Sequence, residues 1–232
     1  ALNGSEALLK AQGLALYPGQ AAASDIEPEY IAVSADGSRA YVTLQEVNAV
    51  AVIDLTDAGA DRPLSILPLG YVDHNLDGNE FDASDRDGSS NGPAINLQNW
   101  DVNGLLQPDA IATFSVGGVT YFVTANEGDA RVGSGIADTD VARLSTVDLD
   151  NTLFPNEAAL KANTALGRLN ILTKIGDIDG DGDIDQIYAL GGRSITIFRQ
   201  EADGSITKVR ETGGEFEMIT SALGTSFNGF VA

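Results

Sequence analysis

A repeated β unit constrains the fold of this chain more than any other feature of its sequence. The first copy begins at the corner Glu27-Pro28-Glu29. Segments rich in β-branched and aromatic residues follow it, separated by short turns, and they predict strands at 30–34, 40–45 and 49–54. Three antiparallel strands of this length form most of one β-propeller blade, and such a blade needs further copies to cover its faces.

A second copy of the unit begins at Gln107-Pro108-Asp109, and a weaker one begins at Glu215. The Tyr41-Val42-Thr43 strand of the first copy is matched by Tyr121-Phe122-Val123-Thr124 in the second. The order of corner, strand, turn and aromatic-led strand is therefore repeated. We predict an all-β chain of the β-propeller class, with blade starts near residues 27, 107 and 215.

Two long acidic or irregular insertions interrupt the repeats, at about 70–99 and 131–168. The remaining residues suffice for about three to four blades, whereas a closed ring takes four or more. We therefore expect residues 1–232 to form a single β-propeller domain or a segment of a larger propeller that extends at both ends. Capping and periodicity predict short helices at 5–12 and 156–165. Further strands are predicted at 14–17, 64–69, 169–174, 186–190, 194–198 and 206–210.

The charge of the chain limits its partners. With 34 acidic and 13 basic residues, its formal net charge is −21. Such a chain repels nucleic acid and anionic membranes and attracts cations. Cysteine is absent, which excludes disulfides and thiolate metal sites. No stretch approaches the roughly 20 apolar residues of a membrane helix, so we expect no membrane insertion. This composition favours a secreted bacterial protein, extracellular or at the cell surface.

The strongest chemical signal is the Asp-rich segment 177–185. Its first, third and fifth positions are carboxylates and its sixth is glycine, as in calcium loops. Tyr188 stands where an EF-hand has its bidentate glutamate, so we predict a calcium loop on a β scaffold rather than an EF-hand. The cofactor is therefore predicted to be calcium, and the predicted ligands are Asp177, Asp179, Asp181, Asp183 and Asp185.

The first insertion repeats the same spacing more weakly. It predicts a second calcium site whose ligands are Asp73, Asn75, Asp77 and Asp82. The alternative is a flexible acidic loop. His74 is the only histidine, and we expect a surface residue there, with a catalytic role as the lesser alternative.

The segment Asn126–Arg131 follows a predicted strand and offers a possible catalytic group. Glu127 and Asp129 could bind a metal while Arg131 holds a phosphate, as in a metal-dependent phosphatase. The alternative, which we favour, is a turn held by an ion pair. The chain has no serine-hydrolase elbow, Walker loop, HExxH or dinucleotide fingerprint, so no catalytic residue is assigned.

Several linked motifs together resemble one known family. They are EPEYIAVSADGSRAYVTLQEVNAVAVIDL, LPLGYVDHNLDGNEFDASDRDG, QPDAIA, VTANEGDAR, ALGRL and GDIDGDGDIDQIYALGGRS. In this order the chain resembles the choice-of-anchor I family of bacterial secreted or surface β-propeller proteins, and its first repeat resembles YVTN-type propellers. The resemblance implies further blades and varied C-terminal anchors, and it implies no settled activity.

Three functions follow from these observations as hypotheses. The leading one is an extracellular calcium-binding β-propeller module that acts in cell-surface binding or adhesion, toward an unidentified protein or glycan. The second is a metal-dependent phosphoesterase, similar to alkaline phosphatases. The third is a structural subunit of an extracellular filament or surface layer, formed by self-assembly.

Overall fold

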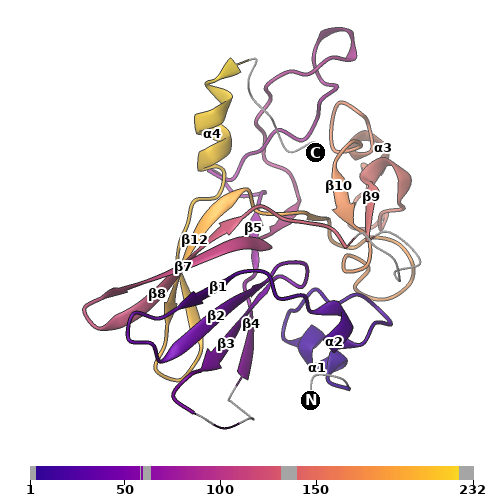
Figure 1. Ribbon diagram of the computed structural model, residues 1–232. Coiled ribbons are helices and arrows are strands. Elements are labelled where there is room, and N and C mark those ends of the chain that lie inside the picture. The colour runs from indigo at the N-terminus through magenta and orange to yellow at the C-terminus, as the bar shows by residue number, and fades with distance from the viewer. Residues whose placement is uncertain (1–3, 58, 60–63, 132–139, 225–232) are drawn as a thin grey trace. The chain divides into compact units, whose positions relative to one another are not determined.

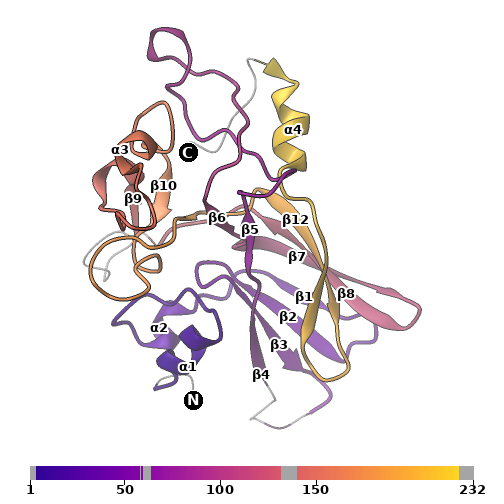
Figure 2. The same cartoon turned by 180° about the vertical axis from the view of Figure 1, so that it is seen from behind.

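The computed structural model describes residues 4–57, 59, 64–131 and 140–224. The chain is mostly β, with three sheets and a few short helices, which confirms the all-β class (Figures 1 and 2). It divides into two compact units. Unit 1 comprises Ala1–Tyr71, Leu106–Asp129 and Gly191–Thr212, and unit 2 comprises Val72–Leu105, Ala130–Leu190 and Gly213–Ala232.

The first sheet of unit 1 is built from the first repeat. Its four antiparallel strands follow one another in chain order: β1 (Ile31–Val33), β2 (Arg39–Leu44), β3 (Ala49–Asp54) and β4 (Leu64–Pro68). The turn between β1 and β2 forms as predicted, because the Asp36 carboxylate accepts bonds from Ser34 and Ser38. Gly37 there has a φ of +72°, which glycine adopts without steric cost.

The second sheet of unit 1 combines the second repeat with a distant hairpin. Its strands are β7 (Pro108–Val116), β8 (Val119–Asn126), β12 (Ser194–Gln200) and β13 (Ile206–Glu211), in the antiparallel order β13-β12-β8-β7. This is again a meander, with residues 127–193 inserted between its second and third strands. The Asn126 amide fixes the junction by donating to the hydroxyls of Ser194 and Thr196, at 2.9 and 2.7 Å.

Alternating side chains pack the two sheets of unit 1 together. The ring of Tyr41 lies 5.1 Å from that of Phe122, which lies 5.0 Å from that of Phe198, and all three are buried. On its other face, the first sheet is covered by the N-terminal segment, which includes α1 (Glu6–Ala11) and α2 (Ala22–Asp25). Residues 14–17, predicted as a strand, form an irregular segment outside the sheets whose Leu14 and Leu16 pack into this core.

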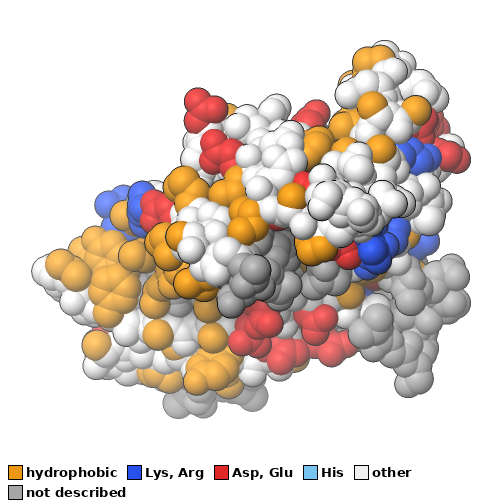
Figure 3. Space-filling model, turned by 90° about the horizontal axis from the view of Figure 1, so that it is seen from above, with side chains coloured by type: hydrophobic (Ala, Val, Ile, Leu, Met, Phe, Trp, Pro, Cys, Tyr) orange, Lys and Arg blue, Asp and Glu red, His pale blue; other side chains and the backbone are white. Residues whose placement is uncertain are grey.

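At the β7–β8 hairpin of the second sheet, the chain leaves apolar side chains exposed. Phe114, Val116 and Val119 are at least a third exposed, and the Phe114 ring stacks on that of Tyr121 at 5.3 Å. Figure 3 shows hydrophobic side chains gathered on the left of the view. Acidic side chains form separate groups on the same face.

Unit 2 has a smaller mixed sheet and its own core. The sheet order is β5 (Tyr71–Asp73), β6 (Asn103–Leu105), β11 (Tyr188–Ala189), β10 (Asn170–Leu172) and β9 (Val141–Arg143), and only β6 and β11 are parallel. Its 3₁₀ turns are η1 (Ser89–Asn91) and η2 (Leu144–Thr146). Buried side chains such as Phe81, Leu149 and Ile184 form the core. Strand β5 lies within the first insertion, at about 70–99, for which the sequence predicts no strand.

Two predicted elements are corrected by the structure. Glu215–Ser221 forms helix α4 and does not begin a strand as the third repeat predicted. Phe216 stands where the first two copies have proline, so the backbone is free to become helical, and Glu215 and Glu217 suit the positive end of a helix dipole. The helix predicted over 156–165 is only the single turn α3 (Glu157–Leu160).

The sheets do not close into a barrel or ring in the part of the chain that the structure describes. The propeller class therefore stays a prediction. Among the same residues, no helix is long and apolar enough to cross a membrane.

A bidentate ion pair within unit 2 gives a first testable expectation. Arg168 donates from Nε and Nη2 to the Asp85 carboxylate at 2.5 and 3.0 Å, and these bonds lower the pKa of Asp85. A lowered carboxyl pKa contributes stability above the unfolded value, about 3.9, and loses it as the pH falls through the folded value. Both side chains are partly exposed, so we expect R168Q to lower the stability at pH 7 only slightly.

Urea unfolding at pH 7 and near pH 3 measures this difference. The cost of R168Q should shrink at the lower pH, because the stability that a lowered carboxyl pKa contributes is lost as the pH falls below the unfolded value. R86Q is the matched control, because Arg86 lies 3.6 Å from the same carboxylate and is more exposed. An equal cost for R168Q at both pH values would contradict the assignment.

Candidate functional site

The Asp-rich segment 177–185 is a loop of unit 2 that connects β10 to β11 and is anchored at both ends. Asp185 and Gln186 donate from their backbone N–H groups to the carbonyl of Gly176, at 2.9 and 3.1 Å. Near its end, Ile184 is buried in the unit 2 core and forms a parallel bridge with Leu149. The loop is thus tied to the segment that contains Asp150.

Inside the loop, backbone N–H groups orient the first and last carboxylates. Asp177 accepts from Gly180 at 2.7 Å and from Gly182 at 3.1 Å. Asp185 accepts from the N–H of Ile178 at 2.6 Å. Gly180 and Gly182 have φ values of +82° and +106°, so they make the turns that the sequence assigned to glycine.

Two groups of carboxylates meet at this loop. Asp177, Asp179 and Asp185 each offer one oxygen, and these oxygens lie within 4.8 Å of one another. Asp183 and Asp185 form a second such group with Asp150. Calcium binds oxygens at 2.3–2.6 Å, so two ligands of one ion are at most about 5 Å apart and both groups fit it. Asp185 is common to the two groups.

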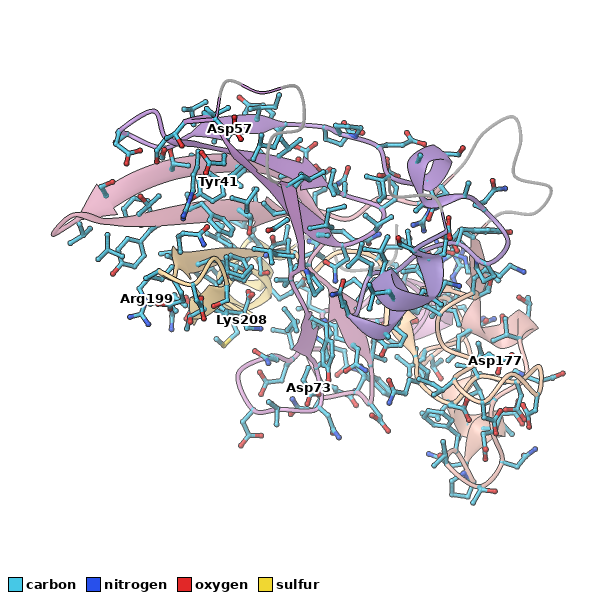
Figure 4. All side chains as sticks on the ribbon, turned by 90° about the horizontal axis from the view of Figure 1, so that it is seen from below. Tyr41, Asp57, Asp73, Asp177, Arg199 and Lys208 are labelled. Atoms are coloured by element: carbon cyan, nitrogen blue, oxygen red, sulfur yellow. The ribbon has the colours of Figure 1, made fainter. Side chains whose placement is uncertain are left out.

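The calcium ligands predicted from the sequence did not include Asp150, and they did include Asp181. Asp150 joins the site only through the bridge between Leu149 and Ile184, and no spacing rule signals such a contact. Asp181 is exposed and belongs to neither carboxylate group; its Oδ1 accepts the N–H of Asp183 at 3.2 Å. Its role as a ligand stays a prediction. Figure 4 shows Asp177 among the acidic side chains of this loop.

The electrostatics of the loop oppose full ionisation. Burial, followed by repulsion from Asp181, Asp150 and Asp185, raises the pKa of Asp183 to about 6. Among the described residues, Asp183 Oδ1 is a buried oxygen without a hydrogen-bond partner. For Asp179, the N–H of Asp181 lowers the pKa, but repulsion from Asp181, burial, and repulsion from Asp185 and Asp177 together outweigh this bond and raise it. A cation would relieve this repulsion.

The second predicted calcium site lies at the end of β5. Asp73 accepts the N–H of Asn75 at 2.9 Å, which forms a local turn. Asp82 is buried, and burial raises its pKa, although its carboxylate lies 3.4 Å from the N–H groups of both Ser84 and Asn96. The carboxylate groups found among the described residues include neither Asp73, Asp77 nor Asp82. A calcium site here therefore stays a prediction.

The expectation that His74 is a surface residue is wrong. The side chain is 2% exposed, and its ring packs on Phe81 with centroids 4.4 Å apart. Its Nδ1 lies 2.7 Å from the carbonyl of Asn79, which can only accept, so Nδ1 carries the proton. Burial lowers the pKa of the imidazole. His74 therefore packs against Phe81 and hydrogen-bonds to the Asn79 backbone inside unit 2.

The possible catalytic group at 127–131 does not gain support. Arg131 is buried and pairs with Asp140, with Nη1 2.7 Å from Oδ2. Asp129 accepts a bond through its backbone carbonyl from Gln107 at 2.9 Å. Glu127 is exposed at the end of β8. Arg131 forms an ion pair, as expected from the favoured alternative of a turn held by an ion pair. Its partner, Asp140, was not predicted.

A third carboxylate group, also missed, lies in unit 1. Oxygens of Glu27, Glu29 and Glu46 approach within 4.8 Å of one another. Glu27 and Glu29 belong to the first repeat corner, and Glu46 lies in the turn after β2. The acid-Pro-acid corner was the only sequence signal for this group.

Together, the sheets and the acidic loop define a mostly β protein with carboxylate groups suited to a hard cation. Residues 1–231 match the model of the choice-of-anchor I domain, and the chain belongs to the choice-of-anchor I family. Choice-of-anchor domains occur in bacterial surface-associated proteins. Comparisons with the curated proteins and with the solved structures gave no match.

Proposed function

We propose that this chain is a calcium-stabilised β-propeller module that acts outside the bacterial cell by binding a surface protein or glycan. The observation that carries the proposal is the position of Asp185 in two carboxylate groups, each with three oxygens within 4.8 Å. Family membership supports the surface location. The absence of common hydrolase and nucleotide-binding motifs favours binding over catalysis.

The donor set of the loop favours calcium. Carboxylate oxygens are hard ligands, and calcium accepts six to eight oxygens in a flexible arrangement. Three carboxylates supply three to six of these, and backbone carbonyls or water can supply the rest. Magnesium demands near-ideal octahedral geometry at shorter distances, which an irregular loop satisfies less readily.

Calcium would couple this loop to the fold of unit 2. Asp150 precedes α3 in the chain, whereas Asp183 and Asp185 lie near the end of the loop. An ion held by these three residues would join two segments whose carboxylates otherwise repel each other. Binding energy of this kind adds to folding energy, because the unfolded chain does not preserve the site. The module would therefore be most stable where calcium is plentiful.

The topology of unit 1 supports the propeller part of the proposal. Both of its four-stranded sheets are antiparallel meanders, which is the topology of a propeller blade. They pack face to face through Tyr41 and Phe122, which lie in the matched strands of the two sequence repeats. In this interpretation, unit 1 supplies two successive blades, and most of unit 2 consists of insertions between their strands.

Thermal unfolding with calcium and with a chelator tests the function. Calcium at about 100 times its dissociation constant should stabilise the protein by about 2.7 kcal/mol, which raises its melting temperature. Magnesium at the same concentration should have a smaller effect. Equal melting temperatures in calcium and chelator would count against a calcium-stabilised module.

A further inference from the structure

We propose that two copies of this chain associate through the outer face of the second sheet of unit 1, with a ridge on each copy seated in a hollow on the other. The outer face is the side of this sheet that points away from the first sheet. The occupant of the face is therefore a second copy of the same surface, in a closed two-fold arrangement. This association is separate from calcium binding by the 177–185 loop, which lies in unit 2.

Burial and strand register define the residues of this outer face. In β12, buried residues alternate with partly buried ones, and Ile195 and Ile197 are among the latter. The register continues the same side of the sheet through every second residue of 119–125 in β8 and of 110–116 in β7. All of these positions are apolar or aromatic. The sheet thus presents a continuous apolar surface across three strands.

Other parts of the chain cover the remaining sheet faces of unit 1. The two inner faces pack on each other through aromatic rings such as those of Tyr41 and Phe122, and the N-terminal segment covers the outer face of the first sheet. On the outer face of the second sheet, Phe114 is 37% exposed, Val116 60% and Val119 38%. Figure 3 shows hydrophobic side chains gathered on the left of the view, where Figure 1 places the β7–β8 hairpin.

The size of this face is that of a protein interface. Its four strands lie about 4.8 Å apart and rise about 3.3 Å per residue, so they span roughly 20 by 25 Å, or about 500 Å² in plane. The accessible area is larger, because side chains project from that plane, and a standard interface buries about 800 Å² on each partner. Exposed apolar patches of this size mark interaction sites on soluble proteins.

The charge of the face allows a second copy of this acidic chain to approach it. The chain carries 34 acidic residues, yet none of them occupies an outer-face position in the registered pairs of these four strands. Arg199 and Arg210 lie on its β12–β13 side, and Glu201 pairs with Arg199 at 2.8 Å. The acids at the rim include Asp109, in the bulge of β7. Two chains of net charge −21 repel each other least where carboxylates are missing.

The relief of the face is complementary to itself. Phe114 and Tyr121 face each other across β7 and β8, and their rings stack with centroids 5.3 Å apart, which forms an aromatic ridge. Farther from the hairpin turn lies a hollow of about 290 Å³, whose lining includes Ala110, Ala112 and Ala125. Ridge and hollow are centred about four residues apart along β7, which is roughly 13 Å.

A two-fold axis in the plane of the interface brings each ridge over the hollow of the other copy. Ala112 pairs with Val123 and lies midway between Ala110 and Phe114, so an axis that crosses the strands there exchanges the two ends of the face. Such an isologous contact fills both hollows at once. Aromatic side chains bury about 150–250 Å² each and dominate interface energetics. This match favours a second copy over an unrelated partner.

Sedimentation equilibrium of the full chain in calcium buffer, over a range of concentrations, tests the association. We expect the mass to rise from 24.1 kDa to twice that value and no further. A112D should weaken the dimer at least about tenfold, because it places two like charges near the axis. S115D is the matched control: Ser115 is exposed and lies on the other side of β7, so the dissociation constant should not change.

A125L separates a ridge seated in a hollow from adhesion by apolar surface alone. Ala125 is exposed, so leucine fits the folded chain but fills the hollow. We expect it to weaken the dimer about tenfold, as overpacking does. Adhesion that depended only on apolar area would instead become stronger, and that result would overturn the proposed geometry.

The remaining outcomes also decide the proposal. A wild-type chain of 24.1 kDa at every concentration, or a mass that rises beyond the dimer, overturns it. Equal weakening by A112D and S115D shows that another surface is used. Melting curves of each variant show whether it is folded. Calcium-induced stabilisation of a monomeric chain contradicts only the dimer, whereas a dimer without that stabilisation contradicts only the calcium-dependent function.

Discussion

Replacing Asp185 by asparagine is expected to remove most of the stabilisation that calcium gives to this protein. Asp185 belongs to both carboxylate groups of the loop, so D185N weakens each of them at once. A tenfold loss of calcium affinity, the least that we expect, removes about 1.4 kcal/mol of stabilisation at saturating calcium. Thermal unfolding of the variant in calcium and in chelator measures this loss.

The same variant should behave differently in chelator. Asparagine retains an oxygen that can accept the N–H of Ile178, so the loop keeps this bond. It also removes one of the charges that repel Asp183 and Asp179. D185N should therefore be as stable as the wild type without calcium, or more stable, and less stable with it. General damage to the fold would instead lower the stability in both conditions.

D148N is the matched control for the loss of one negative charge. The Asp148 side chain is 91% exposed and lies in the same unit, next to the segment that contains Asp150. It belongs to neither carboxylate group. We expect D148N to retain the calcium-induced rise in melting temperature, and an equal loss in D148N and D185N would show that only net charge matters.

Replacing Gly191 by alanine is expected to destabilise unit 1 by about 3 kcal/mol or more. Gly191 has a φ of +68°, and an added Cβ would lie 1.8 Å from the carbonyl oxygen of Glu127 and 2.8 Å from the backbone nitrogen of Gly128. These contacts are with backbone, which cannot rotate away as a side chain does. The strand β12 that follows would have to move away from β8.

The hydrogen bonds of one buried side chain, Gln107, explain why the backbone at Gly191 lies so close to the backbone at Glu127. Gln107 is fully buried; its side-chain oxygen accepts the N–H of Gly191 at 3.1 Å, and its amide nitrogen donates to the carbonyl of Asp129 at 2.9 Å. Its backbone N–H donates to the Asn48 side chain at 2.9 Å. One side chain thus links the start of the second repeat to the segments after β8 and before β12.

Urea unfolding compares G191A with a control glycine of similar conformation. Gly204 has a φ of +93°, and an added Cβ there meets nothing within 4 Å. G204A should therefore cost only the conformational strain of a left-handed alanine, about 1–2 kcal/mol. If G191A costs no more than G204A, the close approach at Gly191 does not limit the fold.

The local parts of this fold could be predicted from the sequence. Strands β1 to β3 are rich in β-branched and aromatic residues and are joined by turns whose residues specify their geometry, so hydrogen bonds between neighbours in the chain decide their pairing. The repeat predicted β7 and β8 for the same reason. The Asp spacing of 177–185 also predicted a loop in which glycines make the turns, and Gly180 and Gly182 do so.

The parts that depend on distant contacts could not be predicted. Asp150 reaches the loop through a bridge to Ile184, and Arg131 finds Asp140 across residues outside the described ranges. His74 is buried because Phe81 packs on it, although its neighbours in the sequence are polar. The third predicted copy does not begin a strand, because it shares only acidic residues with the corners of the other two copies. It lacks the proline that restrains the backbone at those corners.

Equilibrium dialysis of the chelator-stripped chain against calcium measures directly whether the 177–185 loop binds the ion. We predict saturable binding of at least one calcium ion per chain, lost or strongly weakened in D185N and retained in D148N. A wild-type chain that binds no calcium at millimolar concentration, or a D185N chain that binds as much as the wild type with the same affinity, would contradict the assignment of the 177–185 loop as a calcium site.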